Sequence, residues 1–337
     1  MISKQHYIWV DYAKFLSIFL VVYFHSPPVL SGFAGIFLHL IRIPCFFFLA
    51  GLLFKFDKYP TFKQYFIHRS KQLLIPYFCF FILFYTYWLI IGRKTGVADD
   101  WAAPFYQPIV EYLRGTPRLV CMPLWFVPCL LVMQCVFYLV FKRIKRLWAV
   151  LLLFLFPFIP LLVNLENTPC SLDAVCRGIP FYGMASLYKN EIFQFVEKGK
   201  NRIAAFVSLS INLLLSFLLT HQQNDFGQAL IELFGSFTIL LPVLILMKWT
   251  ANFVGRSLFV EKMSRNAIII LAFHTYSIII IQKLILLYSN EPVVFFEGKY
   301  ILKLIIASGS MLSMILPVWF INKYTPFVLG AKIRKPT

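Results

Sequence analysis

The sequence predicts an all-α, polytopic membrane helix bundle of about ten transmembrane helices, with both termini in the cytoplasm. Of its 337 residues, 60% are hydrophobic and only 14% are charged, whereas a soluble domain has about 45–50% apolar and about 25% charged residues. Too little polar surface is available to cover a soluble enzyme, a disordered chain or a disulfide scaffold. Two further observations, long apolar runs and an uneven distribution of basic residues, support the same class.

The apolar runs define the expected helices, because a membrane-spanning helix needs about 20 apolar residues. A kink is expected in the fifth run at Pro157 and Pro160. The sixth run is the least regular, since it holds Pro180 and also Arg177, which either pairs with Glu232 or ends its helix. The ten runs are 8–26, 33–54, 73–92, 122–141, 147–165, 173–189, 203–219, 229–248, 266–288 and 300–321.

The basic residues predict the orientation. With both termini in the cytoplasm, 22 of the 32 Lys and Arg residues fall in cytoplasmic segments and 5 in external ones, as the positive-inside rule expects. They form short clusters between apolar runs rather than one continuous basic face. The net charge of +18 therefore reflects membrane topology, and we expect no nucleic-acid partner.

The segment 93–121 is the longest one expected on the external side. Its stretch PFYQPIVEYLRGTP predicts either a short interfacial helix or lid, or a plain connecting loop with interfacial aromatic residues. Seven cysteines are present, and none has metal-ligand spacing, so no metal site is expected. Cys170 and Cys176 either pair in an oxidising compartment or stay free thiols.

Three ionisable residues in the first run, Asp11, Lys14 and His25, are the leading catalytic candidates, because ionisable groups inside a membrane are costly. Asp11 and Lys14 are neighbours on a helix surface and can pair. Lys14 and His25 share a face, about 16 Å apart along the axis. An imidazole can take a hydroxyl proton or carry an acyl group. The alternative is that His25 caps the helix and Lys14 reaches toward the interface.

Four segments in order resemble one family of membrane enzymes. They are VDYAKFLSIFLVVYFHS at 10–26, IRIPCFFFLAGLLF at 41–54, HRSKQLLIPYF at 68–78 and PLWFVPCL at 123–130, with a looser match in IIILAFHTYS at 268–277. This set resembles membrane acyltransferase family 3, and is most similar to its fucose 4-O-acetylase-like branch.

The resemblance implies O-acylation, typically acetylation, of an envelope carbohydrate with cytoplasmic acyl-CoA as the donor. His25 matches the histidine of the family's first helix. Lys14 stands where many members have arginine, and Arg42 where the branch commonly has histidine. Ala50 replaces a serine that often precedes the glycine of the second helix.

Further candidates would bind the two substrates. Arg69 and Lys71 would attract the phosphates of coenzyme A, with Arg42 as a further donor contact; the alternative for the first two is ordinary positive-inside anchoring. Trp125 would stack on a sugar ring, unless it only anchors its helix at the interface. His274 would be a second polar group in the cavity, unless a neighbouring helix satisfies it.

These inferences predict a single domain over residues 1–337 that lies in the cytoplasmic membrane. It would transfer an acyl group, in the first instance acetyl, from acyl-CoA to a hydroxyl of a carbohydrate or lipid-linked glycan. The main alternative is a transporter or flippase of lipid-linked sugars, which would leave the mass of the glycan unchanged. A glycan polymerase or ligase is the third alternative, although such an enzyme is expected to have larger external loops.

Overall fold

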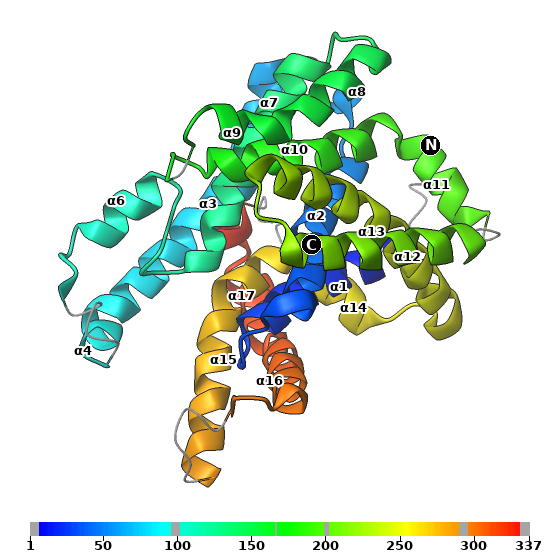
Figure 1. Cartoon of the computed structure of the whole chain (residues 1–337). Helices are drawn as coiled ribbons and strands as arrows, with labels where there is room; N and C mark the ends of the chain where they lie inside the picture. Colours follow the sequence, from blue (N-terminus) through cyan, green and yellow to red (C-terminus); the bar gives the residue numbers. More distant parts are fainter. Residues whose placement is uncertain (1–6, 96–101, 166, 199–201, 290–295, 331–337) are drawn as a thin grey trace.

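The computed structural model describes residues 7–95, 102–165, 167–198, 202–289 and 296–330. These residues form a bundle of helices and contain no strand (Figure 1), which confirms the predicted all-α polytopic class. Eight helical segments are long and apolar enough to cross a membrane. They are Ile8–His25 (α1), Gly32–Leu52 (α2), Phe62–Gly92 (α3 with its π-helical end), Met122–Phe141 (η3 and α7), Arg202–His221 (α12), Asp225–Val254 (α13), Ala267–Ser289 (α15) and Tyr300–Tyr324 (α16 and α17).

The other two predicted spans are shorter. The fifth consists of α8 (Arg146–Leu155), a 3-10 turn (Phe156–Phe158) and α9 (Ile159–Leu162), so the break expected at its two prolines is confirmed. The sixth is α10 (Leu172–Leu187), which has 16 residues. The count of ten spans and the cytoplasmic orientation stay predictions, and the terminal residues 1–6 and 331–337 lie outside the described ones.

Shorter helices lie between the spans and after the last of them. They are η1 (Phe56–Lys58), α4 (Arg93–Thr95), α6 (Gln107–Leu113), α11 (Lys189–Glu197), α14 (Leu258–Arg265) and η6 (Pro326–Leu329). The helix α6 is the short helix expected in the segment 93–121. It is held against α3 by a reciprocal pair of hydrogen bonds, in which the Tyr77 and Tyr112 hydroxyls each donate to the other residue's carbonyl oxygen at 2.7 Å. Cys170 and Cys176 are both free thiols.

The third span begins earlier than predicted. The sequence predicts its start at 73, but α3 begins at Phe62 because Thr61 caps it, with the Thr61 hydroxyl accepting a hydrogen bond from the backbone N–H of Gln64. Arg69 and Lys71 therefore lie within the first turns of α3 rather than before it, and their contact with coenzyme A stays a prediction.

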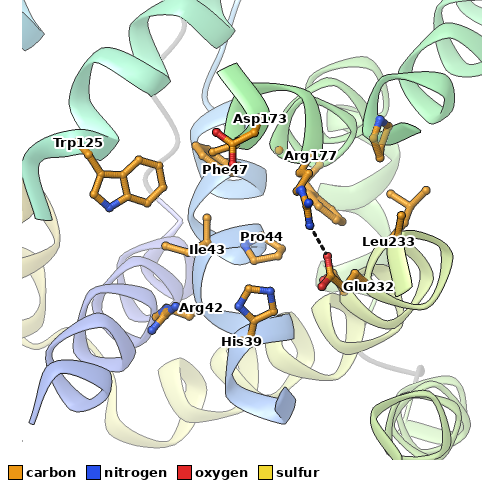
Figure 2. A pocket seen from close by; sticks show the side chains of 16 residues that line it. His39, Arg42, Ile43, Pro44, Phe47, Trp125, Asp173, Arg177, Glu232 and Leu233 are labelled. Atoms are coloured by element: carbon orange, nitrogen blue, oxygen red, sulfur yellow. Dashed lines mark hydrogen bonds and ion pairs between the residues drawn. The ribbon is translucent and has the colours of Figure 1, made fainter. Parts of the chain in front are cut away.

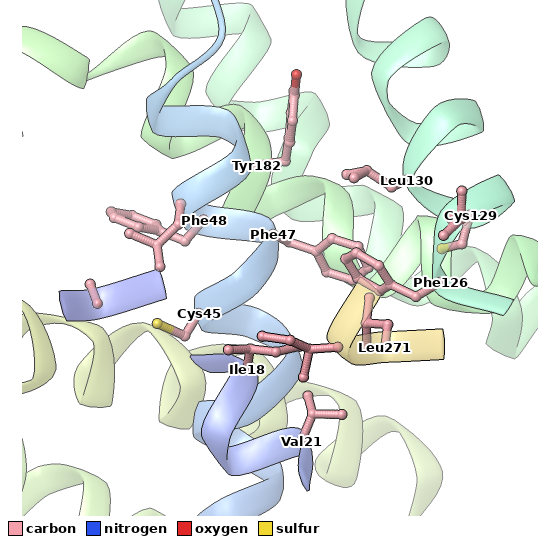
Figure 3. Close-up of a cluster of buried hydrophobic side chains, with 14 of the residues drawn as sticks. Ile18, Val21, Cys45, Phe47, Phe48, Phe126, Cys129, Leu130, Tyr182 and Leu271 are labelled. Carbon is pink, nitrogen blue, oxygen red and sulfur yellow. The ribbon is translucent and has the colours of Figure 1, made fainter. Parts of the chain in front are cut away.

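The helix α1 lies at the centre of the bundle, where it packs against α2, α13, α14, α15 and α16. Figure 3 shows how its residues Ile18 and Val21 meet Phe47 of α2, Phe126 of α7 and Leu271 of α15. All five side chains are buried except for small fractions of their surface. The fold thus surrounds the helix that carries His25 with elements from both halves of the chain.

Glycines bring α2 and α10 into close contact. A methyl group on Gly51 would overlap the backbone carbonyl of Tyr182, and one on Gly178 would lie 2.5 Å from the Phe47 ring. Small residues let helix backbones approach each other in membranes, where burial in lipid gives little drive for association. These contacts fix the wall that α2 and α10 share.

We expect Gly51→Ala to lower the melting temperature of the purified protein in detergent. The added methyl group must separate α2 from the backbone of α10, and overpacking of this kind costs about 1–3 kcal/mol. Gly309→Ala is the matched control, because a methyl group there meets only an ordinary contact 3.4 Å from Ile281 Cδ1. An equal melting temperature for Gly51→Ala and the unchanged protein would contradict the close contact.

Candidate functional site

His25 is the last residue of α1 and borders a cavity of about 260 Å³. The cavity is formed by α1, α2, η3, α7 and α15, and most of its wall is apolar. Its lining residues are Val21, Phe24, His25, Arg42, Ile43, Phe46, Met122, Pro123, Trp125, Phe126 and Leu271. The structure therefore places an imidazole and a guanidinium in one small, largely apolar space.

Arg42 reaches this cavity from α2. Its guanidinium carbon lies 3.5 Å from the centroid of the Phe24 ring, a cation–π contact that keeps the group beside the end of α1. Its buried Nε finds no hydrogen-bond acceptor among the described residues. The backbone of Arg42 is tied to α1, since the Ser17 hydroxyl donates to its carbonyl oxygen at 3.3 Å. Arg42 thus presents an unused donor in a fixed position.

His274 of α15 lies beside His25, with 5.2 Å between the two ring centroids. It is fully buried, and its Nδ1 lies 2.8 Å from the carbonyl oxygen of Ile270. A carbonyl oxygen only accepts, so in the neutral ring we assign the proton to Nδ1 and a lone pair to Nε2. That Nε2 has no partner among the described residues, so it is available to accept a hydrogen bond.

Lys303 of α16 is a residue that the sequence analysis missed. Its side chain is fully buried, and its Nζ donates to the backbone carbonyls of Phe24, Ser26 and Pro28. The carbonyls at the end of a helix have no partners within it, and a cation there is favourable. Lys303 therefore binds the chain on both sides of His25.

A second cavity, of about 410 Å³, adjoins the first. It lies among α2, α10 and α13, and Figure 2 shows Trp125 on one side of it and Arg177 with Glu232 on the other. Arg42, Ile43 and Trp125 line both cavities. The two spaces therefore share a wall at the place where α2 faces Trp125.

The second cavity carries charges of both signs. Arg177 Nη1 lies 3.1 Å from Glu232 Oε2, which confirms the pairing that the sequence left open. Asp173 from the first turn of α10 and His39 from α2 also line the space. No local sequence pattern links these two residues to the histidine of α1, so the sequence does not predict them as site residues.

Lys14 and Asp11 lie elsewhere, near the opposite end of α1. The Ser264 hydroxyl of α14 donates to Asp11 Oδ1 at 3.1 Å, and Asp11 and Arg265 are the charged groups that act on the Lys14 ammonium. Lys14 is not among the described residues that line the His25 cavity. The shared helical face predicted from the spacing therefore does not bring Lys14 and His25 to one cavity.

Arg69 and Lys71 are also distant from this cavity. Arg69 Nε donates to Gln134 Oε1 at 2.8 Å, and its Nη1 donates to Gln72 Oε1 at 2.8 Å. Lys71 is exposed. Of the predicted site residues, the structure brings together His25, Arg42, Trp125 and His274, and it leaves the two pairs Asp11 with Lys14 and Arg69 with Lys71 outside.

Comparison with known proteins adds one finding. A family model described as an acyltransferase domain, that of acyltransferase family 3, matches residues 7–322. No curated protein and no solved structure matches the chain.

Proposed function

The chain belongs to acyltransferase family 3, and from this premise we propose that it transfers an acetyl group from acetyl-CoA to a hydroxyl of an envelope carbohydrate. Membership in the family and the eight apolar helices make it a multi-pass membrane acyltransferase. The donor, the acceptor and the cytoplasmic membrane as its location belong to the proposal. Its place in the fucose 4-O-acetylase-like branch stays a prediction.

The observation that carries the proposal is the position of His25 beside Arg42, where two cavities meet. An acyltransferase that moves its group directly must hold donor and acceptor side by side. The cavity of about 260 Å³ around His25 has room for a thioester carbonyl and its short acyl chain. The adjoining cavity of about 410 Å³ has room for an acceptor.

In the proposed step, His25 removes the proton of the acceptor hydroxyl while the oxygen attacks the thioester carbonyl. A carbon–oxygen bond forms, the carbon–sulfur bond breaks, and the proton passes from His25 to the sulfur of coenzyme A. The unused Nε–H of Arg42 would stabilise the negative charge on the carbonyl oxygen. His274, through its Nε2 lone pair, would accept an N–H from His25 and orient the imidazole.

We propose that basic residues distant from His25 bind the donor on the cytoplasmic side. Arg69 and Lys71 would hold the phosphates of coenzyme A, and Lys14, oriented by Asp11, would hold polar groups of the donor. In this arrangement the donor enters opposite to the end of α1 where His25 lies.

Envelope glycans from cells with and without the protein test this function by mass spectrometry. We expect one added acyl mass per modified sugar, and we expect the purified protein to transfer radiolabel from acetyl-CoA. A transporter or flippase of lipid-linked sugars would work without acyl-CoA and leave the glycan mass unchanged. Unchanged glycans together with normal glycan export would therefore reject the transferase and favour the transporter.

A further inference from the structure

We infer that the cavity of about 410 Å³ among α2, α10 and α13 binds the acceptor as a neutral, hydroxyl-rich sugar ring. This inference rests on the proposed function and adds to it the place and the charge of the acceptor. The reacting hydroxyl would reach His25 at the place where Arg42 and Trp125 line both cavities.

The depth of the polar residues supports this assignment. His39, Arg177 and Glu232 all lie within about two turns of the N-terminal ends of α2, α10 and α13.

The three helices run side by side, since Leu40 of α2 approaches Gly235 of α13 and Phe47 approaches Gly178 of α10. The short connection from α1 into α2 puts His25 at this same end. The predicted orientation makes it the external end, where a glycan arrives.

The chemistry of the lining suits a sugar. Asp173 and Glu232 offer carboxylate oxygens that accept hydrogen bonds from hydroxyl groups. The aromatic rings of Trp125 and Phe181 line the same space and can cover the apolar face of a ring. Ligand pockets of about 300–1,000 Å³ with mostly apolar walls and a few polar groups are typical of small-molecule sites.

The charge balance favours a neutral ring. The cavity holds two guanidinium groups, Arg42 and Arg177, and two carboxylates, Asp173 and Glu232, and one of each is already paired at 3.1 Å. The lining charges balance, so the third carboxylate of an acidic sugar or the third cation of an amino sugar would leave one charge without a counter-charge. A neutral sugar can bind the mixed lining through hydrogen bonds alone.

Acetyl transfer by the purified protein in detergent tests the charge of the acceptor. The probes are radiolabelled acetyl-CoA with p-nitrophenyl glycosides of three neutral sugars (glucose, galactose, fucose) and of glucuronic acid. We expect label on at least one neutral glycoside and at least tenfold less on the glucuronide. A glucuronide that is acetylated as well as the best neutral sugar would overturn the inference.

Glu232→Gln tests whether the cavity of about 410 Å³ binds the acceptor. It removes a charged acceptor and its pair with Arg177, so we expect the half-saturating concentration of the best neutral glycoside to rise about tenfold or more, and the rate at saturation to fall less. Asp173→Asn, which leaves the ion pair between Arg177 and Glu232 in place, is the second variant if Glu232→Gln lowers the melting temperature. Glu191→Gln is the matched control, because Glu191 pairs with Arg146 away from the cavity.

The outcomes separate this inference from the proposed function. If the unchanged protein acetylates a glycoside but both cavity variants saturate at the same concentration as Glu191→Gln, the cavity does not bind the acceptor and the transferase stands. If the unchanged protein transfers no acetyl group to any of the four glycosides or to isolated envelope glycans, the proposed function fails.

Discussion

Replacement of His25 by alanine is expected to reduce acylation of envelope glycans by at least about 100-fold, since general acid–base catalysis contributes about 10²–10⁴-fold. Among the described residues, His25 is the only histidine that lines the cavity of about 260 Å³. Its loss removes the base for the acceptor hydroxyl, while Arg42 and Trp125 still line the cavity. Mass spectrometry of the glycans and transfer by the purified protein both measure the effect.

His221→Ala provides the matched control. His221 is also the last residue of a spanning helix, α12, but it is exposed and hydrogen-bonds within its own last turn. We expect this variant to keep the acylation of the unchanged protein. If His25→Ala is inserted and folded as well as His221→Ala and retains full acylation, His25 has no part in the chemistry.

The fold class could be predicted from composition because the membrane imposes it. Apolar runs such as Ile8–His25 and Ala267–Ser289 must be helical in lipid, where every backbone polar group needs an internal partner. The bounds of the helices were harder to predict, because a hydropathy profile does not detect amphipathic turns that precede an apolar run, as in α3. The signal for the true start of α3 was present in Thr61 and Gln64, a capping-box pattern.

The candidate site was predictable only in part. His25 could be predicted as a site residue, because it is a histidine at the end of an apolar run. Arg42, Trp125 and His274 come from three other helices, and only the packing of those helices brings them to His25. Sequence spacing describes the faces of one helix, so it places Lys14 and His25 on one face of α1 but does not show which other helices pack beside each of them.

Lys303 shows a second limit of sequence reasoning. Its partners are backbone carbonyls, and every residue has one, so no side-chain pattern identifies them. The sequence indicates only that a lysine lies in an apolar helix, where a costly buried charge needs a partner. Because α16 packs against α1, the Lys303 ammonium reaches the backbone carbonyls at the end of α1 that carries His25.

Lys303→Met is expected to reduce the rate of acyl transfer by about 100-fold, the effect that a misplacement of about 1 Å has on a catalytic group. The methionine keeps the length of the side chain but donates to none of the carbonyls of Phe24, Ser26 and Pro28. The end of α1 then loses its anchor and His25 moves. We expect the maximal rate to fall while the half-saturating concentrations of donor and acceptor change little, because Lys303 lines neither cavity.

Lys303→Arg and Lys323→Met distinguish the positioning of His25 from a general loss of structure. Arginine keeps a cation that can donate to several carbonyls, so we expect it to restore part of the rate. Lys323, near the end of α17, lies over the rings of Trp319 and Tyr324 at 5.0 Å, and its replacement should leave the rate unchanged. Measured on the monodisperse fraction of each variant, a Lys303→Met rate equal to that of Lys323→Met would show that the carbonyl contacts do not position His25.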